Sequence, residues 1–582
     1  MKTFRARDQV PGLAGVHSGH SGTLTLSGLG LLIVVGLLAW GCQEEDDTPP
    51  GPQEGSRIEG RVIYSGHPVP GATVRIRTTG ISTVTLPDGV FCLDIPSYMD
   101  TVTITAWAEG YYIGGGLACQ PGDTGILISL EPFSTADNKN YRWVSAYSVS
   151  GESLNCENCH SDPGSRTGLP FDQWILDAHS GSAVNPRFLT MYGGTDVQGN
   201  RSPATVYMNH PEYGPIPLAP DRTVPYFGPG YKLDFPETDG NCAACHAPLA
   251  AIDNPYGTNP LELAGTQLEG ISCDFCHKIV DVRSGQGSPG PGQNMPGVLS
   301  YRFARPPEGH QLFTGPFDDV APGEDTWSPL QKESRYCAPC HVGDFWGVRI
   351  YNSYGEWLES PYSAGPTGKT CQDCHMPAGS ADRFATAEAG GCIRDPSGIG
   401  THRMLGIRDG TFMQSAVSMV AGAALEDGRI NVHVEITNDN TGHHIPTDSP
   451  LRHLILVIRA EDSRGDTLQR LSGPVLPGWC GEGDQDEGYY AGLPGVVYAR
   501  ILREHWTEKE PTAAYWMQTM EVSDNRIRAF ETATADFSFA PPSGGSARIR
   551  VDLIFRRAFI ELADQKGWDH EDILLAGRLI EI

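Results

Sequence analysis

The chain has 582 residues, which is long enough for roughly three to four domains. Its formal net charge of −28 makes binding to nucleic acid unfavourable, because nucleic acids carry negative phosphate groups. Gly (70 residues) and Pro (45 residues) together stay below the share that is typical of low-complexity chains, so we expect a folded, loop-rich protein.

The N-terminus has the pattern of an export signal. Three basic residues precede an apolar run over residues 24–40, and Gly41 and Cys42 follow at once. This order resembles a bacterial lipoprotein signal. The resemblance implies a signal peptide over residues 1–41, lipidation of Cys42, and anchoring to the outer membrane on its periplasmic or cell-surface side. The alternatives are an uncleaved anchor, since the run just reaches the length of a span, and a simple cleaved signal. Residues 42–55, acidic and proline-rich, are predicted to be a linker.

Alternating apolar residues begin at Ile58 and predict an N-terminal β-sandwich over residues 56–132. Cys92 and Cys119 are candidates for a disulfide in an oxidising compartment, and two buried free thiols are the alternative. The segment also resembles the carboxypeptidase regulatory-like (transthyretin-like) domain, which implies a spacer or adhesion module. The resemblance rests on Gly60-Arg61-Val62, Pro70-Gly71-Ala72-Thr73-Val74, Thr85 through Asp88-Gly89 to Phe91, and Glu109-Gly110-Tyr111.

The word C-x-x-C-H occurs five times between residues 156 and 375, and we number these occurrences motifs 1 to 5. It is the attachment signature of c-type haem: two cysteines form thioethers with the porphyrin, and the histidine binds the iron. Structural zinc also uses C-x-x-C pairs, but it does not need a histidine after every second cysteine. With 18 His in the chain, five such coincidences have a chance of about 3 × 10⁻⁸. The sequence therefore predicts five covalent haem c groups, with thioethers to Cys156, Cys159, Cys242, Cys245, Cys273, Cys276, Cys337, Cys340, Cys371 and Cys374, and proximal iron ligands His160, His246, His277, His341 and His375.

The five motifs define a predicted pentahaem domain over residues 140–410, which is mostly α-helical or irregular. Gly and Pro interrupt most helical patterns there, although a helix is expected over residues 171–180. Successive motifs begin 86, 31, 64 and 34 residues apart. The two short separations favour close packing of motif 2 with motif 3 and of motif 4 with motif 5.

A haem iron that only transfers electrons needs a sixth ligand, whereas an iron that performs chemistry keeps this position open. Outside the motifs, the pentahaem domain holds four histidines for five haems, so we expect the fifth ligand to come from the C-terminal domain. Met208 is the rival ligand to His210, and His444 is expected to be structural. The predicted distal ligands are His179, His210, His310, His402 and His443.

Strand alternation returns after the last motif and predicts a C-terminal β-sandwich over residues 411–582. A strand is also expected at residues 496–503 and a short helix at residues 557–566. Cys392 and Cys480 are candidates for a disulfide that ties this domain to the pentahaem domain. The alternating runs are RINVHVEIT, LILVIRA, ADFSFA and ARIRVDLIF.

Residues from about 150 to 570 resemble a multihaem cytochrome c family related to the tetrahaem cytochromes and hydroxylamine oxidoreductase. The resemblance implies bis-histidine haems and favours His443 over His444 as a ligand. No motif has the form C-x-x-C-K of the pentahaem nitrite reductases, so that catalytic site is absent. The resemblance rests on CENCH with Trp174 and His179, on GISCDFCHKI, on YCAPCHVGDFWGVRIYNSYGEWLESPY, on TCQDCHMPAG, on TGHHIPTD, and on DNRIRAFE followed by a Phe-x-Phe strand.

These patterns predict an exported electron carrier rather than a catalyst. Five closely packed, mostly bis-histidine haems are expected to relay electrons between redox protein partners, one donor and one acceptor, in the periplasm, at the outer membrane or outside the cell. The first alternative is a haem oxidoreductase that reduces a small nitrogen or sulfur species at one open iron. The second is an adhesion or assembly protein in which the haems only support the structure.

Overall fold

The computed structural model describes residues 56–149, 154–165, 168–285, 295–570 and 572–582. The predicted signal peptide, the lipidation site Cys42 and the linker therefore lie outside the described residues. Residues Gln53–Ile582 form one compact unit. Within the described part of the chain, no helix is both long and apolar enough to cross a membrane.

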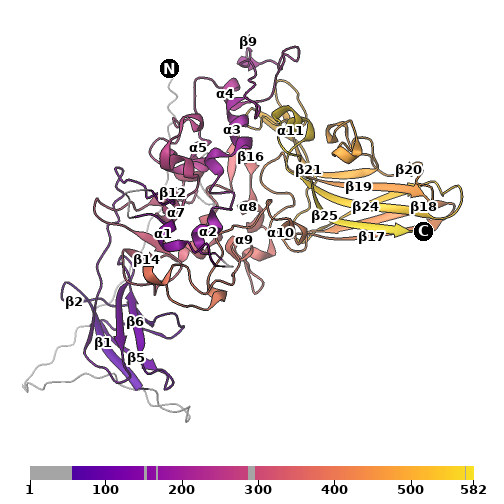
Figure 1. Ribbon diagram of the computed structural model, residues 1–582. Coiled ribbons are helices and arrows are strands. Elements are labelled where there is room, and N and C mark those ends of the chain that lie inside the picture. The colour runs from indigo at the N-terminus through magenta and orange to yellow at the C-terminus, as the bar shows by residue number, and fades with distance from the viewer. Residues whose placement is uncertain (1–55, 150–153, 166–167, 286–294, 571) are drawn as a thin grey trace, which may run out of the picture. The chain divides into compact units, whose positions relative to one another are not determined.

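Two four-stranded sheets occupy residues 56–132 and share one apolar core (Figure 1). In one sheet, β1 lies between β2 and β5, and β8 pairs with β1 in parallel. The other sheet has the order β4-β3-β6-β7. Ile58 and Val62 of β1 and Val74 of β3 are fully buried between the sheets, as the alternating pattern requires. The strands are β1 (Ser56–Tyr64), β2 (His67–Pro68), β3 (Thr73–Ile76), β4 (Ser82–Val84), β5 (Val90–Ile95), β6 (Val102–Trp107), β7 (Gly114–Cys119) and β8 (Ile126–Ser129).

Residues 140–410, here called the motif region, consist mainly of loops, short helices and two-stranded sheets. The helix expected over residues 171–180 is only five residues long, because the chain leaves the helical path after Trp174. The helices are α1 (Glu157–His160), α2 (Pro170–Trp174), α3 (Pro186–Gly193), α4 (Tyr231–Asp234), α5 (Ala243–His246), α6 (Pro248–Ala251), α7 (Cys273–Cys276), α8 (Ser353–Leu358) and α9 (Cys371–His375). The strand pairs are β9 (Tyr207–His210) with β10 (Gly214–Pro217), β11 (Ile279–Val282) with β12 (Tyr301–Phe303), β13 (Phe313–Gly315) with β14 (Asp325–Trp327), and β15 (Gly343–Phe345) with β16 (Val348–Tyr351).

The C-terminal region, residues 411–582, contains two sheets with the orders β17-β18-β23-β20 and β22-β21-β19-β24-β25 (Figure 1). Their inner faces form the largest apolar core, to which Val434 of β18 and Leu456 of β19 contribute. The elements are α10 (Gly410–Gln414), β17 (Ser418–Glu426), β18 (Arg429–Thr437), β19 (His453–Asp462), β20 (Arg470–Ser472), β21 (Gly495–Glu504), β22 (Thr519–Asp524), β23 (Thr532–Phe539), β24 (Ala547–Arg556), α11 (Ile560–Lys566) and β25 (Ile573–Glu581). A long loop between β18 and β19 carries His443.

Candidate haem-binding site

Each C-x-x-C-H motif folds into one helical turn. In motifs 1 to 4, the backbone N–H of the motif histidine donates a hydrogen bond to the carbonyl of the first cysteine. These bonds are His160 N to Cys156 O (2.9 Å), His246 N to Cys242 O (3.1 Å), His277 N to Cys273 O (3.0 Å) and His341 N to Cys337 O (3.2 Å). Motif 5 lies in α9, whose N-cap Thr370 accepts a hydrogen bond from the Asp373 N–H. Because positions i, i+3 and i+4 share one helix face, this turn presents both thiols and the imidazole together.

Three motif histidines are anchored through Nδ1 to backbone carbonyls. His160 bonds to Phe384 O (2.6 Å), His277 to Thr314 O (2.6 Å) and His375 to Leu405 O (2.5 Å). A carbonyl only accepts, so Nδ1 must carry the proton and Nε2 keeps its lone pair. This is the tautomer that binds a metal through Nε2, and the residues therefore fit a haem iron.

His179 and His341 face each other as an axial pair would. Their ring centroids lie 6.4 Å apart with an interplanar angle of 72°. Two imidazoles that bind one metal through nitrogens about 2 Å away have centroids about 6 Å apart. The predicted distal ligand His179 therefore lies opposite the proximal histidine of motif 4.

Carboxylates lie beside both rings of this pair. The Asp177 carboxylate accepts from His179 Nδ1 at 2.6 Å, and Asp448 Oδ2 lies 3.5 Å from His341 Nδ1. Burial alone would lower the pKa of His341, but the buried Asp448 carboxylate outweighs it and raises this pKa to about 9.

His443 from the C-terminal region faces His375 of motif 5, with ring centroids 6.2 Å apart and an interplanar angle of 20°. Its Nδ1 bonds to the carbonyl of His444 (2.9 Å), which again leaves Nε2 free. His444 instead turns toward Glu356. Of the two adjacent histidines, His443 is therefore the one whose ring faces a motif histidine.

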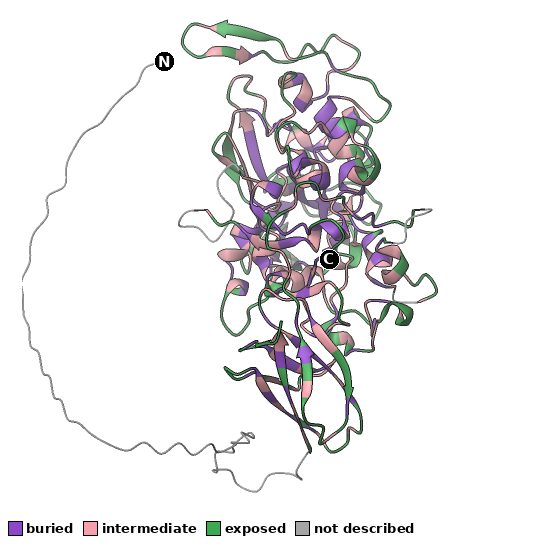
Figure 2. Cartoon of the chain, turned by 90° about the vertical axis from the view of Figure 1, so that its left-hand side faces the viewer, coloured by how far each residue is buried: buried purple, intermediate pink, exposed green. Residues whose placement is uncertain are grey.

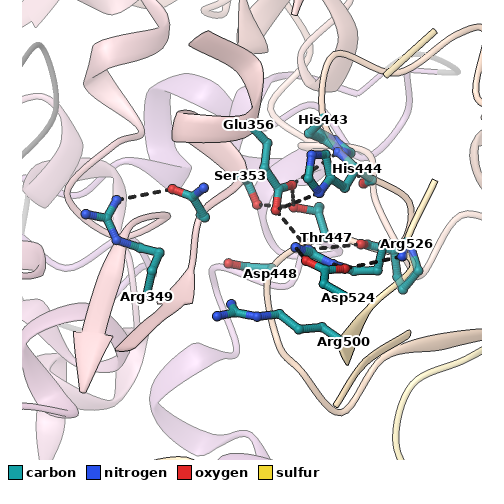
Figure 3. Close-up of polar contacts among 12 residues, drawn as sticks. Arg349, Ser353, Glu356, His443, His444, Thr447, Asp448, Arg500, Asp524 and Arg526 are labelled. Carbon is teal, nitrogen blue, oxygen red and sulfur yellow. Dashed lines mark hydrogen bonds and ion pairs between the residues drawn. The ribbon is translucent and has the colours of Figure 1, made fainter. Parts of the chain in front are cut away.

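A buried polar network holds the His443 loop against the motif region (Figure 3). Glu356 on α8, only 3% exposed, accepts from His444 N (3.1 Å) and from Thr447 Oγ1 (2.5 Å). Its second oxygen accepts from Arg526 Nη1 at 2.8 Å, and Arg526 also pairs with Asp524. Glu356 therefore ties the loop to α8 through several buried hydrogen bonds.

His402 lies beside motifs 1 and 3. Its backbone N–H donates to Gln173 Oε1 (2.8 Å), and its buried Nδ1 has no hydrogen-bond partner among the described residues. Burial, reinforced by His277 and then His160, lowers the pKa of His402 to about 4. An imidazole that stays neutral is the form that binds iron, so this prediction is compatible with the structure.

Two predicted distal ligands are placed elsewhere. His210 lies on the β9–β10 hairpin, which is largely exposed (Figure 2), and its ring stacks on Tyr213 at 4.8 Å. His310 is 60% exposed in its side chain and pairs with Glu324 at 2.9 Å. Neither ring forms a pair with a motif histidine among the described residues, so these two ligands stay predictions without support from the geometry. Met208, the rival to His210, is also exposed.

The histidine of motif 2 has a different neighbour from those of motifs 4 and 5. The His246 ring stacks on Phe188 at a centroid distance of 4.0 Å and an interplanar angle of 8°. Among the described residues, none of the five predicted distal histidines forms a ring pair with His246.

Cysteines of different motifs are in contact. The neighbouring thiols that interact are Cys156 with Cys273, Cys245 with Cys340, and Cys337 with Cys371. They connect motif 1 to motif 3, motif 2 to motif 4, and motif 4 to motif 5. The spacing along the sequence therefore indicated the contact between motifs 4 and 5 correctly, but it did not indicate the contacts of motif 4 with motif 2 or of motif 1 with motif 3.

The two disulfides considered from the sequence do not form. Cys119, Cys392 and Cys480 are free thiols, and Cys119 and Cys480 are buried. The C-terminal region is instead held by polar contacts such as Lys566, whose fully buried ammonium group donates to the carbonyls of Thr190, Thr195 and Pro229.

Sequence reasoning missed Asp177, Asp448 and Glu356, the acids that support the predicted ligands. A signal for two of them was available, since Asp177 precedes His179 by two residues and Asp448 follows His443 by five. Carboxylates behind metal-binding histidines are common, so acids close to a predicted ligand deserve inspection.

Comparisons with known proteins found no matching family model and no matching curated protein. Among solved structures, a penta-haem cytochrome c552 from Thermochromatium tepidum aligns with 73% of this chain and 97% of its own, at 20% identity and a TM-score of 0.49. The Fcho1 Mu homology domain from Danio rerio, with a bound Eps15 peptide, aligns with 29% of this chain and 44% of its own, at 11% identity and a TM-score of 0.11. At these TM-scores neither alignment determines the fold or the function.

Proposed function

We propose that this chain is a multihaem c-type cytochrome that relays electrons through five covalently bound haems. The observation that carries the proposal is the contact between thiols of different motifs. A thiol that becomes a thioether fixes the edge of its porphyrin, so touching cysteines bring the edges of neighbouring cofactors together. When bound, the haems supply one-electron chemistry.

The residues of this chain serve that role in three ways. The cysteines fix each cofactor. His160, His277 and His375 offer Nε2 from a tautomer set by their Nδ1 contacts. His179, His402 and His443 supply second axial positions at three of the haems. Two histidines on one iron suit an electron carrier, because a filled sixth position blocks substrate binding. The anchored rings also limit reorganisation when the charge of the site changes.

The cellular setting of this proposal follows from the N-terminal pattern. An exported chain, lipid-anchored through Cys42 at the outer membrane, would exchange electrons with redox proteins in the periplasm or at the cell surface. A net charge of −28 favours partners with basic docking surfaces. Binding of the purified protein to basic and to acidic ion-exchange surfaces at increasing salt concentration would test this preference for basic partners.

The decisive experiment is spectroscopy of the full-length holoprotein. The haem content should be five per chain, and the ferric spectrum should be dominated by low-spin signals. Stepwise reduction should be reversible, with several one-electron transitions. A count below five, or a spectrum dominated by high-spin iron, would contradict the relay.

A second candidate function arises at motif 2. No predicted distal histidine forms a ring pair with His246 among the described residues, where Phe188 stacks on this ring instead. We infer that this site could bind a small nitrogen or sulfur oxyanion at an open iron. Cyanide or nitrite should then perturb the haem signal of motif 2, whereas a spectrum unchanged by both ligands excludes this function.

A further inference from the structure

The axial pair of motif 4 has an environment that differs from those of the other motifs. Asp177 Oδ1 accepts from both Nδ1 (2.6 Å) and the backbone N–H (2.8 Å) of His179, and its side chain is 5% exposed. Asp448 lies 3.5 Å from His341 Nδ1 and is 17% exposed. That distance is long for a hydrogen bond, so Asp448 acts mainly as a buried negative charge.

At motif 5, both axial histidines contact neutral acceptors instead. His375 bonds to Leu405 O and His443 to His444 O. The motif histidines His160 and His277 also bond to carbonyls. Among the described residues, motif 4 is therefore the site where both imidazoles of an axial pair face carboxylates.

A carboxylate beside a ligating imidazole makes the ligand more basic and adds negative charge near the iron. Both effects stabilise Fe(III) relative to Fe(II), so the reduction potential falls. Partial burial of the two acids keeps solvent from screening them fully. Arg452 offsets part of the charge of Asp448, but at 3.9 Å it is farther from the carboxylate than His341 is.

Motif 4 also lies at the centre of the motif contacts. Cys340 contacts Cys245 of motif 2, and Cys337 contacts Cys371 of motif 5. Tyr336, directly before motif 4, donates its hydroxyl to the carbonyl of Cys276 in motif 3 at 2.8 Å. Motif 4 therefore contacts motifs 2, 3 and 5, and a substitution at motif 4 alters these contacts.

We propose that Asp177 and Asp448 give the motif 4 site the lowest reduction potential of the five. This inference rests on the proposed relay. A haem held there would gain one electron from a reduced neighbour as Fe(III) becomes Fe(II), and Asp177 and Asp448 would make this step less favourable. The two acids thereby keep this central position oxidised at rest, so that electrons cross it rather than accumulate there.

The first test needs no substitution. The 72° angle between the rings of His179 and His341 predicts a ferric low-spin electron paramagnetic resonance signal with a large maximal g value, whereas the 20° angle at motif 5 predicts an ordinary rhombic signal. During dithionite titration of the holoprotein, a large-g signal should be the last to disappear. Disappearance of every large-g signal before the rhombic signals would overturn the proposal.

The second test uses Asp177→Asn and Asp448→Asn, with the exposed Asp439→Asn as the matched control near His443. Each of the first two substitutions should favour reduction of the lowest-potential haem by about tenfold, equivalent to about 59 mV for one electron. The control should leave all transitions in place. A shift in a different transition, or no shift in either variant, refutes the assignment.

The haem count separates this inference from the proposed function. Five haems with a different order of reduction would leave the relay standing and refute the role of the two acids. Fewer than five haems would refute the relay itself. Because the two variants alter separate elements, one that fails to fold still leaves the other and the unmodified protein informative.

Discussion

The N-terminal and C-terminal β-rich regions both contact the motif region, but in different ways. Residues 56–132 contact it from outside: Arg75 forms two bonds to Asp318 (2.8 and 2.9 Å), and Trp107 donates to Thr326 (2.9 Å). The C-terminal region instead inserts a loop that places His443 opposite His375. The two regions share the same alternating strand pattern, but only the C-terminal region places a predicted ligand beside a motif. The loops between the strands, rather than the strands, make this difference.

The largest expected effect comes from removing the inserted ligand. His443→Ala should convert one low-spin haem to high spin, because its ring faces His375 and its Nδ1 contact to the His444 carbonyl leaves Nε2 as the available nitrogen. His444→Ala is the matched control, since His444 interacts with Glu356 and should leave the spin state unchanged. The ferric optical spectrum measures both. If His444→Ala produces the high-spin signal and His443→Ala does not, the two roles are reversed.

Breaking the contact that holds the loop should have the next largest effect. Glu356→Ala leaves Arg526 partly unpaired in a buried site, and loss of one partner of such a pair costs about 3–5 kcal/mol. We expect a lower midpoint of thermal unfolding and partial high-spin character at one haem.

Glu359→Ala is the matched control for this substitution. Glu359 directly follows α8 but is exposed, so its loss should change the midpoint very little. Equal destabilisation by both substitutions would show that the Glu356 network does not fix the loop.

The sequence predicted the strands better than the loops. The run RINVHVEIT is β18 (Arg429–Thr437), because alternation directly reports a strand with one buried face. β17 (Ser418–Glu426) was not predicted, since its small residues alternate weakly and its pairing with β18 makes it a strand.

Among the site residues, the motifs were evident from local spacing, whereas the distal ligands depended on tertiary structure. His179 follows motif 1 closely along the chain, yet it faces His341 of motif 4, so sequence proximity did not identify its partner. His443 had a resemblance to support it. From the sequence, His210 and His310 were equally plausible as distal ligands. Local sequence does not specify whether a loop turns toward a motif or toward solvent. The acids Asp177 and Asp448 gain their role only from the position of a ring, which the sequence does not give.

The smallest expected effect concerns the N-terminal contact. Arg75→Ala should lower stability by about 1 kcal/mol, because the pair with Asp318 is only partly buried, at 23% and 18% exposure. The haem spectrum should not change, since this region supplies no predicted ligand. Arg61→Ala, at an exposed pair with Asp88 inside the same region, is the matched control. A double-mutant cycle with Asp318→Ala measures the coupling energy between the two side chains. A coupling energy near zero would mean that this pair does not hold the two regions together. A change in the haem spectrum would mean that residues 56–132 form part of the haem site.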